Sequence, residues 1–139
     1  MENYIINILA PRLRVAEEKR NKMYLDSKKI ETIGYGHNLR DVPISDRAVE
    51  VIFEDDIEEA AKVVRYYYKN FDTLSDNRKA VLHELAFNMG NNLSTFFNTN
   101  RAINENRWED AVRGFKNSQW YQDVHSIRAD PLLKMLLEG

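Results

Sequence analysis

Three residues near the start of the chain carry side chains that together suit the cleavage of a glycosidic bond. Glu17 lies at the end of a predicted helix, Asp26 at the end of a predicted strand, and Thr32 on a second strand. Such hydrolysis needs one carboxylic acid that donates a proton and a second carboxylate that works with water or attacks the sugar. A nearby hydroxyl can orient that water. The alternative is that all three are ordinary surface residues, because charged residues make up 30% of the chain.

The elements around these residues place them at one cleft. The pattern predicts a helix over residues 10–17, with Pro11 tolerated in its first turn. Two short strands follow at 23–25 and 31–35, joined by a turn at 26–29. A helix end and two antiparallel strands that meet in this way can surround one polar site.

The remainder of the chain reads as helical. Apolar residues recur at three- and four-residue steps over residues 45–71, with Ser45 as N-cap, which predicts a helix long enough to join two lobes. A second helix is expected at 75–89, stopped by Gly90 and buried on more than one face. Shorter helices are predicted at 93–104, at 107–116, from about 118, and at 131–138 with Pro131 at the start.

Composition excludes several classes of protein. The 139 residues include no cysteine, which excludes disulfides, thiolate zinc sites and cysteine nucleophiles. Twenty basic residues against 22 acidic ones give a net charge of −2, which argues against a nucleic-acid binder. No apolar run is long enough to predict insertion into a membrane. The first residues lack the basic start and cleavage site of a secretory signal.

The segment that holds Glu17, Asp26 and Thr32 resembles the active-site segment of phage lysozymes of the T-even type. Type and spacing agree over about 20 residues, and the resemblance extends from about residue 9 to residue 129, with FNMG at 87–90 as a further match. The matching residues of the segment are Glu17, Arg20, Tyr24, Asp26, Thr32, Ile33, Gly34, Gly36 and His37.

The resemblance implies a predominantly helical α+β fold of the lysozyme type in a single domain, residues 1–139. A small β-containing N-terminal lobe would comprise about residues 18–44. A helical C-terminal lobe would comprise about residues 1–17 together with 72–139. The helix at about 45–71 would join the two lobes.

The resemblance also implies a muramidase that cleaves peptidoglycan with inversion at the anomeric carbon. Glu17 would be the general acid, Asp26 would support positive charge on the sugar and help to position water, and Thr32 would hold that water. Gly36, Phe87 and Asn88 would contact the substrate.

Three further residues would support the site according to the same resemblance. Arg128 matches an arginine that pairs with the catalytic glutamate in the family, and His37 would form an ion pair with Asp56. No metal or cofactor is implied, and a monomer is expected.

Two departures from the family pattern leave other functions open. Glu18 replaces a glycine, and the segment between His37 and Ile44 is short where the family has a longer β region. One alternative is therefore a wall-binding or virion structural protein with little or no catalysis. An unrelated helical interaction protein is a further alternative, which would require the motif match to be a coincidence.

The cellular location expected for an active enzyme depends on how it reaches the wall. With no secretory signal, an endolysin would wait in the bacterial cytoplasm for holin-dependent release to the periplasm and cell wall. A virion-borne lysozyme would instead travel with the particle.

Overall fold

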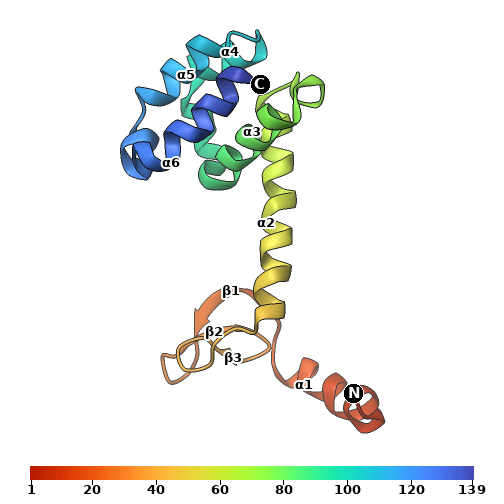
Figure 1. Ribbon diagram of the computed structural model, residues 1–139. Coiled ribbons are helices and arrows are strands. Elements are labelled where there is room, and N and C mark those ends of the chain that lie inside the picture. Colours follow the sequence, from red (N-terminus) through yellow and green to blue (C-terminus); the bar gives the residue numbers. More distant parts are fainter. The chain divides into compact units, whose positions relative to one another are not determined.

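The computed structural model describes all residues from Met1 to Gly139 and divides into two compact units, Met1–Glu50 and Val51–Gly139 (Figure 1). The predominantly helical α+β class that the sequence predicts is confirmed. One small sheet lies in the first unit, and the helices α3 to α6 lie in the second. The lobe boundaries expected from the resemblance, with residues 1–17 in the helical lobe, stay a prediction.

The first unit begins with helical backbone. A π-helical segment, η1 (Ile5–Leu9), continues into α1 (Ala10–Ala16), so residues before the predicted helix are helical as well. Pro11 lies in the first turn of α1, directly after the π-helical segment, so the junction of the two segments has one N–H donor fewer. The helix predicted over residues 10–17 is confirmed, although it ends one residue earlier, at Ala16.

The sheet of the first unit has three antiparallel strands in the order β1 (Arg20–Leu25), β2 (Glu31–Gly34) and β3 (His37–Asn38). The two predicted strands are confirmed, although β1 begins three residues earlier, at an irregular pairing near Arg20. β3 was not predicted, because two residues are too few to show the alternation that marks a strand. β2 ends at Gly34, whose φ of 68° turns the chain toward β3.

Two predicted helices are confirmed with small changes. α2 (Asp46–Tyr67) starts after Ser45, whose hydroxyl accepts a hydrogen bond from the Ala48 N–H at 3.2 Å. It ends four residues before the predicted end, and the 3₁₀ turn η2 (Phe71–Thr73) follows it. α3 (Asp76–Met89) is capped by Ser75 and ends, as predicted, at Gly90.

The last three helices differ more from the prediction. The helix expected from residue 93 is a 3₁₀ segment, η3 (Gly90–Thr95), followed by α4 (Phe97–Asn104). α5 (Trp108–Lys116) is as predicted. The expectation that Pro131 starts the final helix is wrong, because α6 (Gln119–Glu138) contains Pro131.

The backbone of α6 explains how it holds a proline. His125 has φ 63° and ψ 156°, so it divides α6 into two helical pieces. Pro131 then falls early in the second piece, where it removes a single intrahelical hydrogen bond. Ala129, Leu133 and Leu136 of that piece are buried, so tertiary packing outweighs the local preference.

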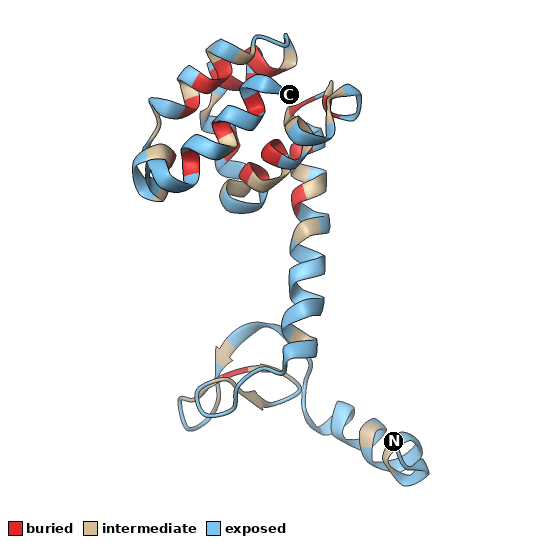
Figure 2. Cartoon of the chain, viewed as in Figure 1, coloured by how far each residue is buried: buried red, intermediate tan, exposed pale blue.

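The apolar core belongs to the second unit (Figure 2). α3 supplies four buried side chains, Val81, Leu82, Leu85 and Ala86, which confirms its prediction as the buried helix. Arg78 on the same helix places its guanidinium 4.1 Å from the centre of the Trp108 ring. The apolar core consists of Ala60, Val64, Tyr68, Phe71, Val81, Leu82, Leu85, Ala86, Leu93, Ala102, Ile103, Ala111, Val112, Phe115, Trp120, Ala129, Leu133 and Leu136.

One buried polar chain crosses this core. The Tyr68 hydroxyl donates to Asn100 Oδ1 at 2.8 Å, and Asn100 Nδ2 donates to the Leu93 carbonyl at 2.7 Å. Tyr68 is 1% exposed, and its burial raises the pKa of the phenol. Both polar groups are therefore satisfied within the core, and together they connect the residue that follows α2 to α4 and η3.

We expect Tyr68→Phe to lower the free energy of unfolding at pH 7 by about 1–3 kcal/mol, because Asn100 Oδ1 stays buried without a donor. The raised pKa of Tyr68 adds a pH dependence. The stability that the folded state gains from holding this proton is fully present below about pH 10, where an unfolded tyrosine titrates. It is lost as the pH rises further. Urea unfolding should therefore show a smaller difference in the free energy of unfolding between variant and wild type above pH 10 than at pH 7.

Tyr66→Phe is the matched control, because Tyr66 lies two residues away and is 68% exposed. It should leave stability close to that of the wild type at both pH values. Equal losses in the two variants would contradict a special role for the Tyr68–Asn100 hydrogen bond.

Candidate active site

Asp26 occupies the turn between β1 and β2, and its carboxylate is held by the backbone of that turn. Asp26 Oδ1 accepts hydrogen bonds from the Lys28 N–H at 2.8 Å and the Ile30 N–H at 2.9 Å. The Asp26 N–H in turn donates to the Ile30 carbonyl at 3.0 Å. Short polar side chains favour such turns because they satisfy backbone donors locally. The second carboxylate oxygen, Oδ2, is left for another partner.

Thr32 is also hydrogen-bonded to the main chain of Ile30. Its hydroxyl donates to the Ile30 carbonyl at 2.8 Å, and Thr32 is 4% exposed, the one buried residue of the first unit. Thr32 pairs with Tyr24 across the sheet, two residues before Asp26. The side chains of Asp26 and Thr32 are thus both hydrogen-bonded to the main chain of Ile30. Their joint role in one site stays a prediction.

Glu17 follows directly after α1 and meets Gly36. Its N–H donates to the Leu13 carbonyl at 2.7 Å, and its backbone is extended, with φ −102° and ψ 110°, which ends the helix. A Cβ built on Gly36 would lie 3.2 Å from Glu17 Oε2, and Gly36 has φ 76°. Only glycine gives the turn this conformation without strain and also leaves room for the carboxylate.

Arg40 is a residue near this site that the sequence analysis did not identify. Its Nε donates to Glu31 Oε2 at 2.7 Å, and this hydrogen bond holds the pKa of the Glu31 carboxyl below its usual value. The second nitrogen, Nη2, donates to the Lys29 carbonyl at 2.7 Å. These contacts join the chain after β3 to the turn that carries Asp26.

The predicted supporting residues of the first unit have defined neighbours. The His37 ring nitrogen Nε2 lies 3.1 Å from the Val42 carbonyl oxygen. Arg20 pairs with Glu18 at 3.3 Å and lies 4.7 Å above the Tyr24 ring. Asp56 belongs to the second unit, and its pairing with His37 stays a prediction.

The other predicted site residues, Phe87, Asn88 and Arg128, lie together in the second unit. All three line a pocket of about 370 Å³. The Arg128 guanidinium donates to Asn88 Oδ1 at 3.3 Å and lies 3.6 Å from Glu84 Oε1. The Phe87 ring meets the Phe53 ring edge-on, with centroids 6.0 Å apart. The pairing of Arg128 with Glu17 that the resemblance implies stays a prediction.

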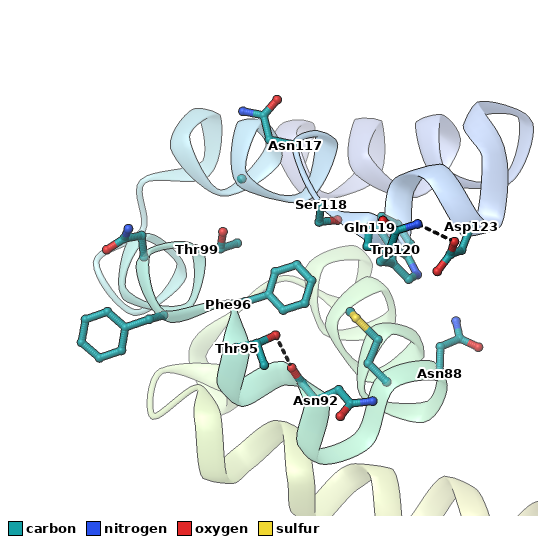
Figure 3. A pocket seen from close by; sticks show the side chains of 14 residues that line it. Asn88, Asn92, Thr95, Phe96, Thr99, Asn117, Ser118, Gln119, Trp120 and Asp123 are labelled. Atoms are coloured by element: carbon teal, nitrogen blue, oxygen red, sulfur yellow. Dashed lines mark hydrogen bonds between the residues drawn. The ribbon is translucent and has the colours of Figure 1, made fainter.

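A larger pocket, of about 690 Å³, adjoins Asn88 in the same unit (Figure 3). Trp120 lines it but is 7% exposed, and its indole Nε1 is a buried donor without a partner. Asp123, the one charged residue of the lining, accepts a hydrogen bond from Gln119 Nε2 at 2.9 Å. Its burial makes Trp120 a core residue, and the sequence did not predict the pocket beside it.

No three histidine or acidic side chains converge as a metal site would require. None of the helices has both the length and the apolar character needed to cross a bilayer.

Comparison of the sequence with known proteins finds a family that matches most of the chain. The protein-family model "Phage lysozyme" matches residues 15–129, a range that contains Glu17, Asp26, Thr32 and Arg128. The chain is 26% identical to "Probable T4-type lysozyme 1" of Dictyostelium discoideum, over 84% of this chain and 86% of that protein.

A second relative is a larger protein. The chain is 26% identical to the "Pre-baseplate central spike protein Gp5" of Enterobacteria phage T4, over 94% of this chain but 28% of the spike protein. "Probable T4-type lysozyme 2" of Dictyostelium discoideum is also 26% identical, with the same coverage as the first lysozyme. From the extent of the family match, the chain belongs to the phage lysozyme family.

Proposed function

We propose that this chain is a muramidase that cleaves the β-1,4 bond between N-acetylmuramic acid and N-acetylglucosamine in peptidoglycan. The family and the two lysozymes among its relatives support a muramidase-like role. The observation that carries the proposal is the attachment of Asp26 and Thr32 to the main chain of one residue, Ile30. Two hydrogen-bond acceptors, the Asp26 carboxylate and the Thr32 hydroxyl oxygen, are thus attached to the same residue.

The hydroxyl of Thr32 has its only proton committed. Because that proton goes to the Ile30 carbonyl, the Thr32 oxygen offers only lone pairs to a bound molecule. A water that donates one proton to Thr32 Oγ1 and the other to Asp26 Oδ2 keeps a lone pair free for attack on the anomeric carbon. Asp26 then takes the proton that this water loses as the new bond forms.

Glu17 supplies the proton that the leaving group needs. Its carboxylic acid protonates the glycosidic oxygen while water attacks from the opposite face, so the configuration at the anomeric carbon inverts. Gly36 leaves the Glu17 carboxylate room beside the turn. In the second unit, Phe87 and Asn88 would contact the glycan, and Arg128 would pair with Glu17.

The route to the wall has two candidates. An endolysin would act after release from the bacterial cytoplasm, whereas the likeness to a baseplate spike protein supports association with a virion. A wall-binding role without catalysis is the alternative function, and the experiment below distinguishes it.

Glu17→Gln tests the proposal directly, because the amide keeps the shape of the side chain but has no acidic proton. We expect wild type to clear suspensions of outer-membrane-stripped Gram-negative cells. The clearing rate of the variant should be about 10²–10⁴-fold lower. Borohydride reduction of the digest should convert N-acetylmuramic acid at the new reducing ends to its sugar alcohol. Detection of this alcohol identifies the bond that was cut.

Glu18→Gln is the matched control, because Glu18 is the next residue and pairs with Arg20. It should clear cells at nearly the wild-type rate. A wild type that binds sacculi without releasing reducing ends would refute the muramidase and support the wall-binding alternative.

Thr32 variants test the proposed water site. Thr32→Val removes the hydroxyl at nearly constant volume, so we expect kcat to fall by about tenfold or more while KM changes little. Thr32→Ser keeps the hydroxyl and should keep most of the activity. Since the valine also loses the bond to the Ile30 carbonyl, its melting temperature is measured alongside; equal kcat in the two variants would contradict the proposed role.

Gly36→Ala tests the space beside Glu17. The new methyl group would lie 3.2 Å from Glu17 Oε2 and should displace the carboxylate, lowering kcat by about tenfold or more. Gly34→Ala is the control, because Gly34 also has positive φ but its Cβ would meet no atom within 4 Å. Both variants should lose similar stability, and a similar loss of kcat in both would show that backbone strain alone is responsible.

A further inference from the structure

One peptide group stands between Arg40 and Asp26. The peptide that joins Lys29 to Ile30 has its carbonyl oxygen bonded to Arg40 Nη2 at 2.7 Å and its N–H bonded to Asp26 Oδ1 at 2.9 Å. A cation therefore holds one end of this peptide, and the carboxylate proposed to activate water holds the other end.

The charge of Arg40 strengthens the second of these bonds. A guanidinium on a carbonyl oxygen draws electron density from the peptide and makes its N–H a better donor, because linked hydrogen bonds polarise one another. The bond from the Ile30 N–H to Asp26 Oδ1 is thereby strengthened, which fixes the direction of the carboxylate. The free oxygen, Oδ2, is fixed with it, since the two carboxylate oxygens are parts of one rigid group.

The contact between Arg40 and the Lys29 carbonyl also stabilises the backbone conformation of Lys29. Lys29 has φ 61°, a left-handed conformation that a residue with a side chain adopts only at some cost. Its N–H donates to the Asp26 carbonyl at 2.9 Å, and its own carbonyl is the group that Arg40 binds. Arg40 thus holds the turn in a conformation that its sequence does not favour.

The ion pair with Glu31 does not by itself explain the position of Arg40. The side chains of Arg40 and Glu31 are 47% and 41% exposed, and exposed pairs contribute little to stability. The pair does orient the guanidinium, so that Nη2 reaches the Lys29 carbonyl. The contact with the peptide is the one that leads to Asp26.

We propose that Arg40 is a positioning residue for the hydrolytic reaction, which acts on Asp26 through the Lys29–Ile30 peptide. The proposal rests on the role of Asp26 in the proposed function. It assigns to the short segment after β3 the task of fixing the water-activating carboxylate.

The test compares Arg40→Gln with Glu31→Gln in the full-length protein. Arg40→Gln removes the positive charge that contacts the Lys29 carbonyl. We therefore expect kcat on purified sacculi to fall about fivefold or more, with KM within about twofold of wild type. Glu31→Gln removes the charge of the ion pair but keeps an oxygen acceptor for Arg40, so its kcat should stay within about twofold. Arg40→Lys keeps a cation and should recover part of the loss.

A second readout needs no enzymatic activity. Hydrogen exchange of the Ile30 amide, followed by NMR, should quicken about fivefold or more in Arg40→Gln and stay near wild type in Glu31→Gln. An unchanged Ile30 amide, or equal losses of kcat in the two variants, would overturn the proposal. If the wild type does not cleave glycan, the catalytic role of Arg40 falls with the proposed function, whereas the Ile30 amide still shows whether the peptide contact exists.

Discussion

The main-chain groups of Ile30 are the constraint on which the site of the first unit depends. The Ile30 N–H fixes the Asp26 carboxylate, and the Ile30 carbonyl accepts from both the Asp26 N–H and the Thr32 hydroxyl. Hydrogen bonds are directional, whereas apolar contacts are not. A site that must present two acceptors to one water gains its precision from bonds of this kind.

The two units are stabilised by different means. Every buried apolar side chain lies between Ala60 and Leu136, in the second unit, where α3 is surrounded by other helices. The first unit instead has a three-stranded sheet, a capped turn and charged contacts such as that between Arg40 and Glu31. Within the first unit, geometry therefore depends on polar groups whose partners are close in sequence.

Much of the fold was predictable because its signals are local. Ser45 and Ser75 cap helices as their positions predicted, and Gly90 ends one. The turn that joins Asp26 to Thr32 was predictable in the same way, from two short strands separated by polar residues. The kink at His125 was not, because burial of residues far along α6 decides whether a helix continues through Pro131.

The candidate site divides in a similar way. Glu17, Asp26 and Thr32 stood out because their types and spacing suit one chemistry. Arg40 carried no such signal: its meeting with Lys29 and Glu31 depends on the return of the chain along β3, a strand too short to predict. The orphaned indole nitrogen of Trp120 was equally hidden, since whether a buried donor finds a partner depends on packing.

The positions of the tryptophans determine which part of the molecule intrinsic fluorescence reports. Its two tryptophans, Trp108 beneath the Arg78 guanidinium and Trp120 in the core, both belong to the second unit. The first unit has tyrosines but no tryptophan. Light emitted by the indoles therefore reports the environment of the helical unit directly. Fraying of the sheet that carries Asp26 and Thr32 can escape this signal, and the backbone amides of that sheet must be followed instead.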